Sequence, residues 1–456
     1  MGYRHYVVCG LGFGDEGKGS VTDFLCSSRS RDPAHAVVRF NGGGQAGHNV
    51  VTADGRHHTF AQFGSGSFTP GVRTHLSRFM LVDPLALAAE AAHLIAAGVP
   101  GALGRLTVDR DARLVTPYHQ AANRARELAR GRDRHGSCGM GIGETARYAL
   151  GHPADAPRVA DCAAPRTLTR SLTRLRDRLA AELGGLEGPP VVDLCDAYRA
   201  FAERVALVDG GYLRRLLRAG PVVLEGAQGV LLDEWRGFHP YTTWSTTTFA
   251  NAETLLAEAG ETAIRLGVVR CYLTRHGPGP FVTEDPTLEF PEPHNRHGTW
   301  QGAFRIGHPD AVALRYAVEV AGGVDGVALT HLDAAARRPL RLCRAYQADG
   351  RLLARIAPGS ARDLRWQERL TGTLLRARPV YDESVSSASS ASSASSAAAP
   401  ASASSAPGPE EWPGIFEEVL GAPVILRSYG PTAAGKREAE PDRATGISFG
   451  KYSGNL

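Results

Sequence analysis

A glycine-rich stretch near the N-terminus, residues 10–20, reads GLGFGDEGKGS. Gly12, Gly17 and Lys18 have the G-x-x-x-x-G-K spacing of a phosphate-binding loop, which directs backbone N–H groups and one lysine at phosphate oxygens. Asp15 and Glu16 stand directly before this Gly-Lys pair. Carboxylates repel phosphates, so two acids at the centre of a phosphate site need a chemical reason.

Three interpretations of this stretch are open. A dinucleotide fingerprint, G-x-G-x-x-G, fails because Asp15 occupies the place of the last glycine. A P-loop fits better, but Gly19 replaces the Ser or Thr that would hold Mg²⁺. A plain glycine-rich turn between a strand and a helix explains neither Lys18 nor the paired acids. The stretch alone does not decide between them.

The elements that must position these residues follow from the hydrophobic pattern. Short apolar runs bounded by glycine and polar turns predict buried strands; these runs are 6–10, 36–41, 221–226, 267–274, 326–333 and 423–430. Helical patterns lie between them, at 83–98, 118–131, 168–183 and 310–323. This alternation predicts an α/β fold with a central, mostly parallel sheet flanked by helices. Functional loops should then follow the carboxyl ends of the strands.

The 456 residues are predicted to form one domain with elaborations, spanning 1–456. Residues 384–409, SVSSASSASSASSAAAPASASSAPGP, lack apolar side chains to bury. They are predicted to be a disordered Ser/Ala-rich insertion.

The composition limits which binding partners and which cellular compartment are expected. A formal net charge of +4 is too small to argue for nucleic acid. The seven cysteines include no C-x-x-C pair, which favours a reduced chain without a disulfide framework or structural zinc. No apolar stretch is long enough to span a membrane. The expectation is a cytoplasmic protein with no membrane or nucleic-acid partner.

Further motifs lie in a fixed order along the chain. They are GFGDEGKGSVTD (12–23), RFNGGGQAGHNV (39–50), GSCGMGIG (136–143), EGAQGVLLD (225–233), TRHGPGPFVTE (274–284), THLD (330–333) and SYGPT (428–432). Together they resemble the adenylosuccinate synthetase family, over nearly the whole chain outside the Ser/Ala stretch. The resemblance implies an α/β, P-loop-like GTP-binding ligase fold. It also implies a homodimer that shares active-site residues across its interface.

The family's reaction gives the acids a reason. It replaces a purine 6-oxo group by the amine of aspartate, using GTP and Mg²⁺: the oxygen is first phosphorylated, and the amine then displaces phosphate. Asp15 matches the family's general base, which must lie beside the phosphates because the oxygen that it activates attacks the γ-phosphoryl group. Mg²⁺ would be held by Asp15 and the carbonyl of Gly47. His48 matches the catalytic histidine, and Lys18 would neutralise phosphate charge.

The binding residues are also carried over from the family. Asp333 would accept hydrogen bonds from guanine N1–H and the 2-amino group, which adenine lacks, and so argues for GTP; it could equally cap a helix. The expected GTP contacts are Gly14, Glu16, Gly17, Gly19, Asp333, Ser428, Gly430 and Pro431. The expected substrate contacts are Gln45, Ser137, Cys138, Gln228, Thr243, Thr299 and Arg305.

Several positions depart from the family pattern. Gln45 replaces an asparagine, Ser137 and Cys138 replace a threonine pair, Met140 replaces an arginine, and His331 replaces a lysine. The partner subunit's phosphate-binding arginine has no match in register, although Arg147 is nearby. In the aspartate-binding loop, Gly302, Ala303 and Phe304 replace the inner arginines. Arginine forks are natural partners of carboxylates and phosphates, so both anion sites are weakened.

The sequence therefore predicts a GTP-dependent C–N ligase of the adenylosuccinate synthetase type. Its substrates would be IMP or a related purine nucleotide or nucleoside, and aspartate or a related amine. The alternatives are ordinary adenylosuccinate synthesis and a GTP-binding regulatory protein without ligase activity. Retention of Asp15 and His48 counts against the regulatory protein, because a binding module needs neither.

Overall fold

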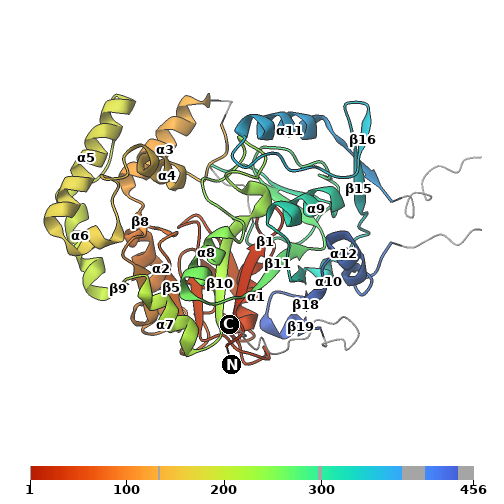
Figure 1. Cartoon of the computed structure of the whole chain (residues 1–456), viewed down its shortest axis with the longest axis horizontal. Helices are drawn as coiled ribbons and strands as arrows, with labels where there is room; N and C mark the ends of the chain where they lie inside the picture. The colour runs from red at the N-terminus through yellow and green to blue at the C-terminus, as the bar shows by residue number, and fades with distance from the viewer. Residues whose placement is uncertain (1, 132–133, 296–299, 383–405, 440–456) are drawn as a thin grey trace, which may run out of the picture.

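The computed structural model describes residues 2–131, 134–295, 300–382 and 406–439. Its centre is a ten-stranded sheet built from these residues (Figure 1). From one edge to the other the strands are β19 (Lys436–Glu438), β18 (Val424–Ser428), β14 (Gly326–Thr330), β11 (Ile264–Arg270), β1 (Tyr6–Gly10), β10 (Val222–Gly229), β2 (Ala36–Arg39), β5 (Arg73–Leu76), β7 (Leu106–Asp109) and β9 (Ala206–Val208).

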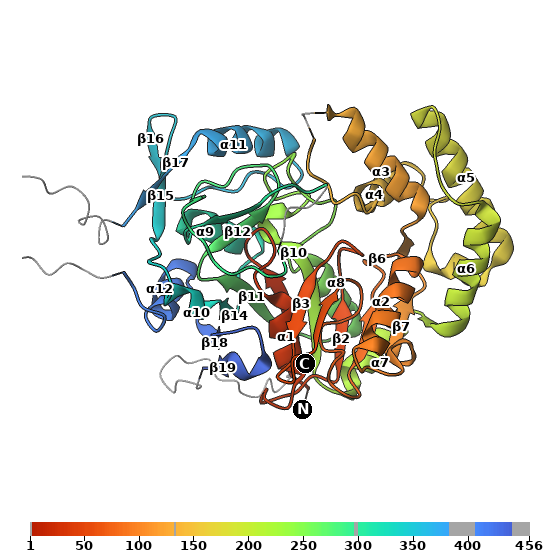
Figure 2. The same cartoon turned by 180° about the vertical axis from the view of Figure 1, so that it is seen from behind.

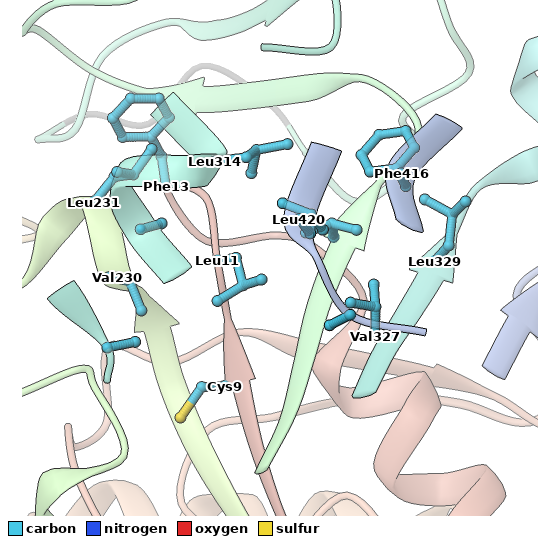
Figure 3. Close-up of a cluster of buried hydrophobic side chains, with 14 of the residues drawn as sticks. Cys9, Leu11, Phe13, Val230, Leu231, Leu314, Val327, Leu329, Phe416 and Leu420 are labelled. Carbon is cyan, nitrogen blue, oxygen red and sulfur yellow. The ribbon is translucent and has the colours of Figure 1, made fainter. Parts of the chain in front are cut away.

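Neighbouring strands in this sheet pair in parallel, apart from β18 with β19. The central strands are buried on both faces, as their continuous apolar runs predict. In β1, Val7 and Cys9 pack into one hydrophobic cluster and Val8 packs into another. Figure 3 shows Cys9 and, directly after β1, Leu11 in the first cluster. Val327 and Leu329 of β14 belong to the same cluster, and β11 lies between the two strands. The predicted parallel sheet is therefore confirmed.

Helices cover the sheet, and further helices lie beyond its two ends (Figures 1 and 2). They are α1 (Lys18–Cys26), α2 (Pro84–Ala96), α3 (Pro117–Ala129), α4 (Ile142–Gly151), α5 (Pro165–Leu183), α6 (Val191–Arg204), α7 (Gly211–Ala219), α8 (Ala250–Ala259), α9 (Ala311–Val320), α10 (Leu332–Ala335), α11 (Leu364–Arg376) and α12 (Trp412–Leu420). Helices α3 to α6 gather at one end of the molecule, and α11 and α12 lie towards the other.

Smaller sheets complete the described fold. They are the pairs β3 (His48–Val51) with β4 (His57–Phe60), β6 (Leu81–Val82) with β8 (Arg113–Leu114), and β12 (Leu273–His276) with β13 (Phe304–Gly307), and the group β15 (Cys343–Ala348), β16 (Arg351–Leu353) and β17 (Arg378–Tyr381). The β3–β4 and β12–β13 pairs begin shortly after strands of the central sheet, so they bring additional side chains to its carboxyl edge.

The predicted helices form with small shifts at their ends. Asp83 caps α2 as expected, and its side chain accepts hydrogen bonds from the backbone N–H groups of Leu85 and Ala86 at 3.0 and 3.1 Å.

Two predicted strands need correction. The run 267–274 is interrupted, because β11 ends at Arg270 and β12 starts at Leu273 in a different sheet. The run 326–333 ends at Thr330, because His331 takes a left-handed conformation (φ 59°) and α10 follows. Both interruptions fall at the edge where function was expected.

Of the predicted insertion 384–409, only residues 406–409 lie within the described residues. No helix in the described ranges has both the length and the apolar character that a bilayer crossing requires.

Candidate active site

A cavity of about 1030 Å³ opens at the carboxyl edge of the central sheet. The loops that follow β1, β2, β10, β14 and β18 contribute to its lining, as does Arg270, the last residue of β11. The predicted site residues that line it are Gly14, Asp15, Gly17, Lys18, Gly19, Gln45, Gly47, His48, Ser137, Cys138, Gln228, Thr243, Asp333, Ser428, Gly430 and Pro431. Glu16 and Arg305 do not line it, and Thr299 lies outside the described residues.

Glu16 folds back into the glycine-rich loop. Its carboxylate accepts hydrogen bonds from the backbone N–H groups of Gly12 (3.0 Å) and Gly14 (2.8 Å) and from Lys18 Nζ (2.6 Å). The Glu16 and Lys18 side chains are both buried. A Cβ at Gly10 would clash with the Glu16 carboxylate, so the close approach requires glycine there. The Glu16 carboxylate therefore shapes the loop and pairs with Lys18, and the expected contact between Glu16 and GTP stays a prediction.

Asp15 is the acid that faces the cavity. It has a left-handed backbone (φ 60°), which is costly for a residue other than glycine and is common at functional sites. Arg270 donates from Nε to the Asp15 carbonyl, and His276 Nε2 lies 3.3 Å from Asp15 Oδ2. Burial acts to raise the pKa of the Asp15 carboxyl, but His276, Arg270 and Lys18 outweigh it and hold the pKa below its usual value. Asp15 is thus kept as a carboxylate.

His48, the first residue of β3, is held by a carboxylate from the central sheet. Its Nδ1 lies 2.7 Å from Oε1 of Glu225, which is fully buried in β10 and also accepts from the Ser65 backbone N–H at 3.0 Å. Burial lowers the pKa of His48 despite this partner. With Nδ1 bonded to Glu225, the other ring nitrogen, Nε2, remains for a ligand. A phosphoryl group beside Nε2 would favour the imidazolium, which donates from Nε2.

Two buried amides at the cavity have polar atoms without partners. Among the described residues, no hydrogen-bond partner exists for either amide atom of Gln45, Oε1 or Nε2. The same holds for Oε1 of Gln228. Gln228 also has a left-handed backbone (φ 58°) in a strand, next to a register shift between β1 and β10. Unpaired buried polar groups are costly, so these amides are suited to a polar ligand.

The ends of β14 and β18 bring four of the expected GTP contacts to the cavity. They are Asp333, Ser428, Gly430 and Pro431. Asp333 belongs to the first turn of α10, and it does not cap that helix. Among the described residues its ion-pair partner is Arg337, at 3.8 Å, and no hydrogen bond from another residue occupies its carboxylate there, so the carboxylate is available to a ligand. Burial raises its pKa. Lys436 Nζ supports the facing turn by donating to the Thr432 carbonyl at 3.0 Å.

Arg305 has a structural task. Its guanidinium donates to the carbonyls of Gly277 (3.1 Å) and Gly279 (2.9 Å) and pairs with Glu284. These bonds hold the Arg305 guanidinium against the turn that follows β12, and its expected contact with the substrate stays a prediction. Gly302, Ala303 and Phe304 also lie outside the cavity lining.

His276, Arg270 and Glu225 were missed as site residues. His276 and Glu225 stood within the motifs TRHGPGPFVTE and EGAQGVLLD, and Arg270 stood within the predicted strand 267–274. A charged or titratable residue in or directly after a buried strand was the signal that could have singled them out.

Comparisons of the sequence with known families and known proteins match adenylosuccinate synthetases. The adenylosuccinate synthetase family model matches residues 7–399. The adenylosuccinate synthetase of Thermoanaerobacter sp. (strain X514) is 33% identical over 391 residues, covering 83% of this chain and 86% of the relative. That of Mycobacterium tuberculosis (strain ATCC 25618 / H37Rv) is 34% identical over 397 residues, covering 83% and 85%.

Two solved structures share the fold. Fully ligated adenylosuccinate synthetase from Plasmodium falciparum aligns with a TM-score of 0.76 and 19% identity, covering 96% of this chain and 100% of that chain. The cyanophage S-2L succinoaminodeoxyadenylate synthetase (PurZ), bound to dGMP and to dATP as an energy donor, aligns with a TM-score of 0.56 and 17% identity, covering 96% of each chain.

Proposed function

Because the chain belongs to the adenylosuccinate synthetase family, and is therefore a ligase that forms C–N bonds, we propose that it uses GTP to activate a purine 6-oxo group for attack by an amine. The observation that carries this proposal is that Asp15 and His48 face one cavity together with the glycine-rich loop. A proton acceptor and a phosphate-side hydrogen-bond donor are both needed for lactam phosphorylation.

We propose two chemical steps. The Asp15 carboxylate takes the N1 proton of the purine, and the 6-oxygen attacks the γ-phosphorus of GTP while GDP leaves. The amine then attacks C6, and the C6–O bond breaks to release phosphate. His48, oriented by Glu225, donates from Nε2 to the transferring phosphoryl group. Backbone N–H groups of the loop hold phosphate oxygens.

Lys18 would contribute positive charge beside those phosphates while it remains paired with Glu16. The unpartnered amides of Gln45 and Gln228 are proposed to bind the purine substrate, with Ser137, Cys138 and Thr243 nearby in the same lining.

The residues present fit a magnesium ion. Mg²⁺ prefers oxygen ligands and in phosphoryl-transfer sites usually takes one or two carboxylates plus phosphate oxygens and water. Asp15 and Gly47 line the same cavity and supply a carboxylate and a backbone carbonyl. When bound, the ion would offset the repulsion between Asp15 and the phosphates and neutralise charge on the transferring group.

We also propose a homodimer in the cytoplasm. Family membership supports the homodimer. The seven cysteines, all of which are free thiols, support a reducing compartment such as the cytoplasm.

An assay of phosphate release tests the proposed function. The purified protein with Mg-GTP is offered a panel of 6-oxo purine nucleotides and nucleosides, each with aspartate and with other amines. Release of phosphate and GDP should require both a purine and an amine. GTP binding without turnover across the whole panel would instead favour the regulatory protein.

Asp333 is proposed to select guanine, and its replacement gives a separate prediction. Asp333→Asn exchanges an acceptor for a donor opposite guanine N1–H, so GTP binding should weaken by about 1–3 kcal/mol. Calorimetric titration of GTP checks this, with Asp209→Asn, an exposed residue after β9, as the matched control. Equal support of the wild-type reaction by ATP and GTP would contradict the guanine assignment.

A further inference from the structure

His276 is the residue that contacts the side chain of Asp15. It ends β12, and its Nε2 lies 3.3 Å from Asp15 Oδ2. Within the described ranges, no other side chain makes a hydrogen bond or ion pair with that carboxylate. Both side chains are partly buried at the cavity wall.

The loop alone fixes only the backbone of Asp15. Gly14 and Gly17 flank it with positive φ values of 96°, and Arg270 binds its carbonyl oxygen. The carboxylate projects from this loop and would still rotate about its side-chain bonds. A general base must lie within hydrogen-bond reach of the proton that it removes, so the side-chain rotamer decides its efficiency.

His276 is itself held in place by Phe304. The two residues are directly opposite in the antiparallel pair of β12 and β13, where facing side chains share one side of the sheet. Their ring centroids are 4.8 Å apart with planes inclined at 57°. Phe304 stands where the family pattern has an arginine, so this position has exchanged a cation for an apolar support.

We propose that His276 is a positioning residue for Asp15 and that Phe304 acts through His276. The imidazole N–H directs Oδ2 and fixes the carboxylate rotamer, while Phe304 prevents the imidazole from turning away. The inference rests on the proposed function, because Asp15 needs orientation only if it removes a proton.

Steady-state kinetics of the full chain test this, using the best purine and amine found for the wild type. His276→Ala should lower kcat by about 10- to 100-fold and leave the Michaelis constant for GTP within about two-fold, because misplacing a catalytic group slows chemistry more than binding. His276→Gln should recover most of kcat, since its amide N–H can donate from a similar place. His93→Ala, an exposed histidine on α2, is the matched control.

Phe304→Leu should lower kcat several-fold on its own. In combination with His276→Ala it should add nothing, because Phe304 is proposed to act only through His276. An unchanged kcat in His276→Ala, or effects that multiply in the double variant, would overturn the inference. If His276→Ala folds poorly in a thermal melt, His276→Gln and Phe304→Leu still decide the question. A wild-type protein that turns over no purine and amine pair would instead overturn the proposed function.

Discussion

Asp15→Asn is expected to lower kcat by about 10²–10⁴, the usual cost of removing a general base. The amide keeps the shape of the side chain and its acceptor towards His276, but it cannot take the N1 proton. Loss of an anionic magnesium ligand would add to the effect. The measurement is kcat at saturating GTP, purine and amine, with GTP affinity followed separately by calorimetry.

Asp196→Asn provides the matched control, because Asp196 is an exposed carboxylate on α6 whose ion-pair partner among the described residues is Arg199. It should retain the wild-type rate, while Asp15→Asn loses turnover and keeps most of its affinity for the nucleotide. An Asp15→Asn variant that turns over at nearly the wild-type rate would remove Asp15 from the mechanism, and with it the reason for an acid beside the phosphates.

The sequence could predict that the candidate site residues gather at one place, because parallel strands deliver their following loops to one edge. Asp15 follows β1, His48 follows β2 and Asp333 follows β14, so strand order alone brings them towards one another. The family motifs then assigned roles that periodicity could not give.

The direction of each side chain was not predictable in the same way. Asp15 and Glu16 are adjacent in the sequence, yet Asp15 lines the cavity and Glu16 turns into the loop, where it accepts from the Gly12 N–H. The left-handed backbone of Asp15 stands at this point, and the sequence pattern did not predict it. Arg305 has the residue type that binds carboxylates, but the carbonyls of Gly277 and Gly279 compete for its guanidinium. Such outcomes depend on contacts between segments distant in the sequence.

The second large effect concerns the substrates: IMP and aspartate are not expected to be the best pair. The groups that activate the 6-oxygen are present, so chemistry at a purine lactam should proceed. The 5′-phosphate of IMP and the carboxylates of aspartate are anionic, and this chain offers them fewer arginines than the family pattern does. The lysine and arginine side chains that line the cavity in the described ranges already have partners. Arg147 and Arg126 pair with Glu144 and Glu182, and Arg270 pairs with Glu292. Lys18 pairs with Glu16, Arg130 pairs with Glu127, and Arg275 donates to the carbonyls of Pro278 and Pro280.

Each lost charge-assisted hydrogen bond should cost roughly 1.5–3 kcal/mol, so two or three losses raise a Michaelis constant by orders of magnitude. The measurement is kcat/KM for IMP and for aspartate under Mg-GTP, compared with other 6-oxo purines and amines. A value of about 10⁴ M⁻¹s⁻¹ or more for both would mean that the departures are tolerated and that the protein makes adenylosuccinate as its relatives are named to do.

Met140→Arg tests the phosphate site from the other direction, because it restores the positive charge that the family has at this position. The variant should lower the Michaelis constant for IMP. If the variant leaves that constant unchanged while an unphosphorylated purine is preferred, the phosphate site has been lost altogether, and the substrate is a nucleoside.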